Sequence, residues 1–378
     1  MIYLDHAATT PLDGEVLQAM MPYLTDVYGN PSSQHSAGRE AANAVTAARD
    51  TIARIVGVPA SNIYFTAGGT EAANTALKGV CAASRERGRH IVLSAIEHPA
   101  LLESARDMCA YGWELTLVDP DGNGIISPDS IAKALRPDTV FVGVMAANNE
   151  VGTVQPIADI YAVVKQHGAF FFSDCVQTAV VLPFAQFPSD GMGFSAHKFY
   201  GPKGVGVLYM KGGARFARLL SGGNQERGLR AGTTNVAGAV GCACALERAC
   251  AAMDKNNKKV VRLRDMFLKL VNQNIEGVHL NGDGQSRLPA NANLSFDGCD
   301  GEQIVFGLDL AGVACSTGSA CSSGAVTSSH VLTAMGLEEQ RVKSAVRFTF
   351  GKDNTEEEVA RSVDCLKAVV ERIRRSRA

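Results

Sequence analysis

The stretch AFFFSDCVQ at residues 169–177, followed by GMGFSAHKFYGPKGVGVLYM at residues 191–210, decides the fold class. It contains three short apolar runs, at Ala169–Ser173, Met192–Ala196 and Val205–Met210. Short runs rich in Phe and Val and bounded by Gly, Pro, Ser and Asp are typical of buried strands. Two of these runs lead directly into side chains capable of chemistry, Asp174 and Lys198.

The same pattern extends on both sides of this stretch. Further buried strands are predicted at Ile63–Thr66, Ile91–Ala95 and Val140–Met145, and amphipathic helices at Ala41–Ile55, Thr70–Ala83, Ile157–His167 and Thr234–Ala252. Strands that alternate with helices predict an α/β fold with a mainly parallel, doubly wound sheet.

The composition changes near Asp254, where the polar stretch Asp254–Lys259 begins. A helical pattern then runs to about Gln273, and strand-like pieces and a last amphipathic helix follow, near Ala292–Phe296, Ala345–Phe350 and Thr355–Arg374. We therefore expect a large domain of residues 14–255 and a smaller α+β domain of residues 1–13 and 256–378. Residues 311–329 are mostly small or polar, which predicts a mobile loop.

Composition and charge exclude several classes of protein. The chain has 378 residues, with 36 basic and 38 acidic side chains, so its net charge of −2 favours neither nucleic acid nor membrane as a partner. No apolar run reaches the roughly 18 residues that span a bilayer, and Asp5 and His6 interrupt the N-terminus before a signal peptide could form. The ten cysteines lack metal-site spacing, which indicates free thiols in a reducing cytoplasm and no metal.

Two strand ends carry the first candidate catalytic residues. Lys198 follows a predicted buried strand, and ligands of open α/β sheets bind at the carboxyl ends of the strands. A desolvated lysine there is able to form a Schiff base, although an exposed loop lysine is the simpler interpretation. Asp174 ends the neighbouring run, where a carboxylate could pair with a pyridinium nitrogen or merely cap a helix.

A third strand end and a glycine turn add to this set. Gly68-Gly69-Thr70 joins a strand to a helix, and the free N–H groups of the helix start, with Thr70, Ser195 and His197, could hold a phosphate. His98 follows another strand and could stack on an aromatic cofactor and relay protons. Each signal alone also fits an ordinary turn or a structural histidine.

The fifth candidate is the small-residue segment CSTGSACSSG at residues 315–324. A cysteine in an exposed loop is reactive when its thiolate is accessible. Cys321 and Cys315 both lie in this segment, and the spacing does not choose between them.

Together these segments resemble the cysteine desulfurases, within the class V aminotransferase group of fold-type I pyridoxal-phosphate enzymes. The resemblance spans nearly the whole chain. Besides the segments above, it includes YLDHAATT at residues 3–10, NPSS at 30–33 with His35, NNEVG at 148–152, QERG at 225–228 and RAGT at 230–233.

The resemblance implies a pyridoxal 5'-phosphate cofactor held by Lys198, with Lys198, His98 and Cys321 as the catalytic residues. It implies that Asn149 and Arg347 hold the substrate carboxylate. The cofactor contacts that it implies are Gly69, Thr70, His98, Asn149, Asp174, Gln177, Ser195, His197, Lys198 and Thr233. Thr233 is expected to reach the phosphate of a neighbouring subunit, which makes the working unit a homodimer.

The implied reaction converts L-cysteine to L-alanine and leaves a persulfide on Cys321. A sulfur-acceptor protein, for iron–sulfur cluster assembly or for tRNA thiolation, would then take the sulfur. The Ser-x-Gly-Ser-Ala-Cys loop resembles that of the long-loop first group of desulfurases.

The sequence departs from the family's pattern at three points. His6 stands where Asn is common, and Cys175 stands beside Asp174 where Ala is usual. The chain also stops soon after its last helix, which weakens the case for a scaffold that docks on a longer tail. Cys175 is expected to be a small core residue.

Three other functions remain open from the sequence. A selenocysteine lyase, or another β-elimination on the same cofactor, would not need Cys321. A true aminotransferase has no use for a loop thiol. A non-catalytic sulfur carrier would need none of Lys198, Asp174, His98 and Arg347.

Overall fold

The computed structural model describes residues 1–317 and 328–377. A seven-stranded sheet forms the centre of the larger part of the molecule, in the order β2-β8-β7-β6-β5-β3-β4. The pairs β3–β4, β3–β5, β5–β6 and β6–β7 are parallel, and β8 runs antiparallel to β2 and β7. The strands are β2 (Ile63–Thr66), β3 (His90–Ser94), β4 (Glu114–Val118), β5 (Thr139–Gly143), β6 (Phe170–Asp174), β7 (Gly191–Ser195) and β8 (Gly206–Met210).

Helices cover both faces of this sheet. Successive side chains on a strand point to opposite faces, so neighbouring residues of one strand pack in different clusters. Ile91 and Leu93 of β3 pack with the helices α4 and α5, whereas Val92 packs in a second cluster with residues of α3, α7 and α8. This is the α/β, doubly wound arrangement that the sequence predicts. The helices of this part are α1 (Gly14–Met20), α2 (Pro22–Thr25), α3 (Ser36–Val56), α4 (Gly69–Ala83), α5 (Pro99–Cys109), α6 (Pro128–Ala134), α7 (Ile157–His167) and α8 (Val236–Ala251).

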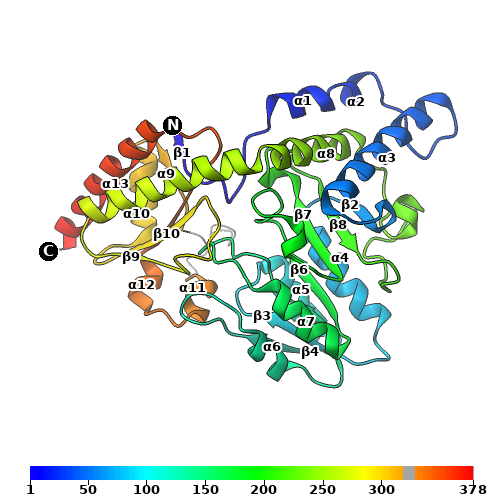
Figure 1. Cartoon of the computed structure of the whole chain (residues 1–378), viewed down its shortest axis with the longest axis horizontal. Coiled ribbons are helices and arrows are strands. Elements are labelled where there is room, and N and C mark those ends of the chain that lie inside the picture. Colours follow the sequence, from blue (N-terminus) through cyan, green and yellow to red (C-terminus); the bar gives the residue numbers. More distant parts are fainter. Residues whose placement is uncertain (318–327, 378) are drawn as a thin grey trace.

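The smaller part has its own hydrophobic core, and Figure 1 shows it to one side of the central sheet, joined to it by the long helix α9. It contains the antiparallel sheet β12-β10-β9 and the parallel pair β1–β11, so the N-terminal strand belongs to it. Its elements are β1 (Ile2–Tyr3), α9 (Met253–Asn274), β9 (Val278–Leu280), β10 (Asn291–Phe296), α10 (Gly301–Leu310), β11 (Val313–Ala314), α11 (His330–Ala334), α12 (Glu339–Lys343), β12 (Ala345–Thr349) and α13 (Glu356–Arg377). Val331 and Leu332 of α11 and Val342 of α12, however, pack in the core cluster of the larger part. The proposed division at residues 13 and 255 therefore stays a prediction.

The structure differs from the sequence-based expectation in two of its elements. The polar stretch 254–259 lies inside α9 rather than before it, because its side chains contact both parts of the molecule: Asn257 Nδ2 donates to Val181 O (2.8 Å) and Lys259 Nζ to Lys352 O (2.7 Å). The predicted loop 311–329 contains the strand β11, which pairs with β1.

Within the described residues, no single helix is long and apolar enough to cross a membrane, although the bent pair α8–α9 passes that test when its two helices are combined.

Candidate active site

The candidate residues meet where three parallel strands end. Asp174 ends β6 and Ser195 ends β7, and the short 3-10 helix Ala196–Lys198 follows β7 directly. His98 lies just beyond β3, immediately before α5. Because the carboxyl ends of parallel strands lie at one edge of a sheet, these side chains surround one region, where open α/β sheets bind ligands.

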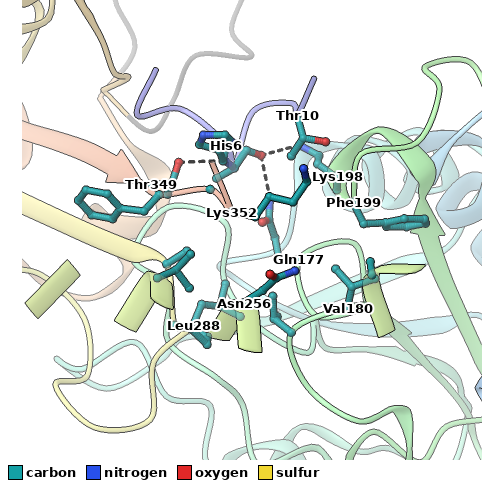
Figure 2. A pocket seen from close by; sticks show the side chains of 18 of the residues that line it. His6, Thr10, Gln177, Val180, Lys198, Phe199, Asn256, Leu288, Thr349 and Lys352 are labelled. Carbon is teal, nitrogen blue, oxygen red and sulfur yellow. Dashed lines mark hydrogen bonds between the residues drawn. The ribbon is translucent and has the colours of Figure 1, made fainter. Parts of the chain in front are cut away.

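Lys198 is half-buried, and its amine contacts the N-terminal segment. Nζ donates to Ala7 O (2.6 Å) and to Ala8 O (2.9 Å), and Gln177 Nε2 donates to the same Ala7 oxygen (3.1 Å). Figure 2 shows the Lys198 and Gln177 side chains pointing together toward the chain beside His6. Two carbonyl oxygens favour a cationic amine, so this segment is a binding site for the ammonium form of Lys198.

The segment 5–10 also contacts other candidate residues, and we call it the N-terminal turn. Thr9 Oγ1 is hydrogen-bonded to His197 Nδ1 (3.1 Å), and both the backbone N–H and the hydroxyl of Thr10 donate to His197 O (2.9 Å each). Ala7 N donates to Thr349 Oγ1 of β12 (2.9 Å). The turn therefore ties the Lys198 helix of the large part to the small part.

His6, one of the departures from the family pattern, has room in this turn because of a glycine. A Cβ at Gly351 would lie 2.2 Å from the His6 ring, so only glycine fits opposite it. The ring also packs edge-on against Tyr3, with ring centroids 5.0 Å apart. Burial lowers the pKa of His6, so a neutral, packed imidazole is the form that the turn holds.

Two buried carboxyl groups lie behind the strand ends. Asp174 is 8% exposed, its Oδ1 accepts from Val176 N (2.8 Å), and burial raises its pKa to about 6, against the opposing charge of Lys198. Glu97 is fully buried, and burial raises its pKa to about 8. Its Oε1 accepts from Ser94 Oγ and from Met145 N (2.7 Å), and Oε2 has no hydrogen-bond partner among the described residues.

The two histidines of the site are held neutral. Burial and the charge of Lys198 lower the pKa of His98 and of His197 to about 4 each. His98 also caps α5, because its Nδ1 accepts from Ala100 N (3.1 Å). A backbone N–H must donate to a bare nitrogen, so the ring proton of His98 is on Nε2. His98 therefore caps α5 through Nδ1 and keeps a proton on Nε2 that it is able to donate.

The glycine turn before α4 lies against the end of β7. Gly68 has a φ of 157°, and a Cβ on Gly69 would lie 2.8 Å from Val176 Cγ2. Ser195 faces this turn, since a Cβ on Gly68 would lie 3.6 Å from its Oγ. Thr70, at the second position of α4, is exposed. Unpaired N–H groups at a helix start, with a nearby hydroxyl, form a place for an anion.

Arg347 of β12 is nearly enclosed. Its side chain is 4% exposed, Nη1 donates to Asn149 O (2.8 Å) and Nη2 forms an ion pair with Asp5 Oδ1 (2.9 Å). Asn149 is thus beside Arg347 through its backbone carbonyl, and the predicted role of the two residues in substrate binding stays a prediction. The Nε atom is buried and lacks a hydrogen-bond partner among the described residues.

Three cysteines, Cys321, Cys315 and Cys175, are the candidate thiols of the site. Cys321, the predicted sulfur-receiving residue, lies outside the described residues. Cys315 is half-buried and Cys175 is fully buried, and desolvation raises the pKa of each thiol to about 12. Neither of these two thiols is poised to ionise near neutral pH.

The exposure of Thr233 and a cavity beside Lys198 are two further features of this region. Thr233, the residue expected to reach a neighbouring subunit, is exposed. A cavity of about 110 Å³ lies beside Lys198 and Gln177, and Asn256, Leu288 and Val180 line its far side (Figure 2). His98 and Asp174 do not line this cavity, so it lies on another side of Lys198.

The sequence did not single out four residues that shape this site. Asp5 pairs with Arg347, and Glu97 lies behind Asp174. Ser329 Oγ donates to the buried Glu150 Oε2 (2.5 Å), and His330 Nε2 is hydrogen-bonded to Glu97 O (3.0 Å). Glu97, next to His98 at a strand end, carried a readable signal, whereas the other contacts join residues far apart in the chain.

The chain is similar to known proteins over nearly its whole length. The family model described as Aminotransferase class-V matches residues 2–361. A protein of Dictyoglomus turgidum named cysteine desulfurase IscS is 44% identical over 99% of this chain and 95% of its own length, and the putative cysteine desulfurase IscS 1 of Bacillus subtilis is 44% identical over 98% and 99%. A solved structure described as a NifS-like protein has a TM-score of 0.92 at 36% identity, covering 98% of this chain and 99% of that one. Another, described as SspA in complex with cysteine, has a TM-score of 0.82 at 32% identity, covering 94% and 100%.

Proposed function

Because the chain belongs to the class V aminotransferase family, we propose that it is a pyridoxal-phosphate-dependent cysteine desulfurase. It converts L-cysteine to L-alanine and passes the sulfur to an acceptor. The names of its relatives support this activity. The observation that carries the proposal is the meeting of Lys198, Asp174 and His98 at one sheet edge, beside an enclosed arginine.

The residues at this edge fit pyridoxal 5'-phosphate. The turn at Gly68 and Gly69 leaves the space that side chains would fill, beside the Ser195 hydroxyl and the free N–H groups of α4. Gly69, Thr70, Ser195 and His197 would hold the phosphate. Asp174 would pair with the ring nitrogen, Gln177 would donate to the phenolic oxygen, and His98 would lie on the ring. When bound, this cofactor supplies a sink for the electron pair left as the substrate loses its Cα proton.

The chain's own residues move the proton. Lys198 Nζ would hold the cofactor, and the free amine of Lys198 would take the Cα proton of the substrate. The ammonium that results is stabilised by the carbonyl oxygens of Ala7 and Ala8, which the amine contacts in this structure. The neutral His98 keeps a proton on Nε2 that it donates during the acid–base steps.

Cys321 is the residue that we assign to the sulfur. Its thiolate attacks the substrate sulfur, an S–S bond forms as the C–S bond breaks, and protonation of the carbon gives alanine. The burial of Cys315 and Cys175 supports this choice, because their thiolates are suppressed. Ser316 and Ser329, on either side of the segment that contains Cys321, are both anchored near the site, to Arg347 and to Glu150.

The finer assignments complete the proposal. A homodimer is supported by the exposure of Thr233 and by exposed apolar side chains on and after α1 and α2, namely Leu17, Met21, Leu24 and Tyr28. The sulfur acceptor is a protein of iron–sulfur cluster assembly or of tRNA thiolation. The compartment that we propose is the cytoplasm, with no direct contact to nucleic acid or membrane.

Mass spectrometry after turnover tests the proposal. After incubation of the holoenzyme with L-cysteine, without reductant, the peptide that contains Cys321 should gain the mass of one sulfur atom, and alanine should appear. Cys321→Ser should keep its cofactor but lose both products, and the matched control Cys315→Ser should retain them. Sulfur on Cys315 instead, or wild-type alanine formation by Cys321→Ser, would overturn the assignment.

A further inference from the structure

We propose that Asp5 is an internal stand-in for the substrate carboxylate. It occupies the Arg347 guanidinium in the resting site and gives way when an amino acid binds. Asp5 is then a specificity-determining residue, because only a ligand with its own carboxylate can replace it. This inference rests on the proposed role of Arg347 as the substrate clamp.

The contacts of Arg347 leave a place for such an exchange. Nη1 is taken by Asn149 O and fixes the plane of the guanidinium. Nη2 is taken by Asp5 Oδ1, while the adjacent Nε is buried without a partner among the described residues. Nε and Nη2 form the side edge of a guanidinium, where a carboxylate binds with both oxygens. Asp5 uses only half of this edge, so an incoming carboxylate gains a hydrogen bond that Asp5 does not make.

Burial explains why a stand-in is needed. The Arg347 side chain is 4% exposed, and an enclosed charge without a partner strongly destabilises a fold. Asp5 neutralises it before substrate arrives. With 18% of its side chain exposed, Asp5 is the more open member of the pair and is able to turn toward solvent when it is displaced.

The backbone of Asp5 is fixed, so the exchange requires only a side-chain rotation. Thr349 N donates to Leu4 O (2.7 Å) on one side of Asp5, and Ala7 N donates to Thr349 Oγ1 (2.9 Å) on the other. Three residues of one turn therefore contact both the arginine and the catalytic amine: Asp5 binds Arg347, and Ala7 and Ala8 bind Lys198.

Ligand binding tests the exchange directly. Asp5→Asn keeps an oxygen that accepts from Nη2 but removes the charge that competes with substrate. The Kd of the holoenzyme for the product L-alanine, measured by calorimetry, should fall by about three- to tenfold, as expected when a charge-assisted hydrogen bond becomes a neutral one. The Kd for ethylamine, which lacks the carboxylate, should not change. The KM for L-cysteine should fall in parallel with the Kd for L-alanine. Asp5→Glu, which keeps the charge, should bind L-alanine and ethylamine with the wild-type Kd values.

Each outcome decides one point. A rise in the alanine Kd of Asp5→Asn, or an equal change for alanine and ethylamine, means that Asp5 is only structural and overturns the inference. Asp5→Ser repeats the charge removal with a smaller side chain if Asp5→Asn does not fold. Arg347→Ala is the separate control: if it binds alanine as tightly as wild type, the proposed clamp fails, whatever Asp5 does.

Discussion

Glu97 shows how one buried side chain links the site to the stability of the fold. Its pKa is about 8 in the folded chain, against 4.5 for an exposed glutamate. The folded chain therefore binds more protons than the unfolded chain between these two pH values, and the free energy of unfolding falls as pH rises through this window. Asp174, with a pKa raised from 3.8 to about 6, acts in the same direction over a lower range.

Glu97→Gln should remove the larger part of this pH dependence. Gln keeps an oxygen that accepts from Ser94 Oγ and Met145 N, and it does not ionise. As pH rises from 5 to 9, the free energy of unfolding of wild type should fall relative to that of Glu97→Gln, by an amount on the order of a few kcal/mol. Urea unfolding at both pH values measures this difference. An unchanged slope with pH would mean that Glu97 is ionised in the folded chain.

His98 caps α5, and we also propose a catalytic role for it; two variants separate the cap from that role. His98→Ala should lose the hydrogen bond to Ala100 N and about 1 kcal/mol of stability, together with most of the activity. His98→Asn restores a side-chain oxygen at the cap and should recover the stability but not the activity. Thermal unfolding and alanine formation are the two measurements. If His98→Asn is as active as wild type, His98 is only a cap.

At the scale of elements, the turn into α4 depends on the missing side chain of Gly69. Gly69→Ala places a methyl group 2.8 Å from Val176 Cγ2, which forces the turn away from the end of β7. The affinity for pyridoxal 5'-phosphate should fall by about tenfold or more, since the N–H groups of a phosphate site act only at short range. Equilibrium dialysis of the cofactor measures this loss.

Val176→Ala is the compensating variant for this prediction, because it removes the methyl group that Gly69→Ala meets. The double variant should recover most of the affinity, and Val176→Ala alone should change it little. A double variant as weak as Gly69→Ala would place the cost in the backbone conformation of the turn rather than in the contact.

The elements that the sequence predicted are those whose signal is local. The buried strands β2, β5 and β8 and the helix α7 follow from apolar runs and helical spacing. The strand β4 was missed. Its first four residues are not fully buried, and its sequence, ELTLV, is not apolar enough to stand out as a buried strand. The start of α9 was predicted too late in the chain. Its polar side chains form hydrogen bonds with residues far away in the sequence, and a local pattern does not show such contacts.

The same distinction holds for the candidate site. Lys198, Asp174 and His98 were predictable because each follows a strand, and strand ends share one edge of the sheet. The ion pair of Asp5 with Arg347 joins residues 342 positions apart, so only the folded chain brings them together. The residues to which we assign the chemistry are therefore local to strand ends, whereas the contacts that surround them are long-range.

At the scale of the whole molecule, the proposed homodimer can be tested through Thr233, which is exposed in the single chain. If Thr233 serves the neighbouring subunit, the two defects Lys198→Ala and Thr233→Ala complement each other in a mixed dimer. In such a dimer, one site combines Lys198 of the Thr233→Ala chain with Thr233 of the Lys198→Ala chain and is intact. The other site lacks both side chains.

Mixed dimers, made by co-expression with two different affinity tags and purified on both, should have about half the wild-type activity. Homodimers of Lys198→Ala should be inactive, and those of Thr233→Ala should bind the cofactor weakly. In contrast, if Thr233 serves its own chain, the mixed dimer has no intact site, and its activity is half that of the Thr233→Ala homodimer. Because the two arrangements predict different activities from the same purified protein, alanine formation decides between a shared site and a self-contained one.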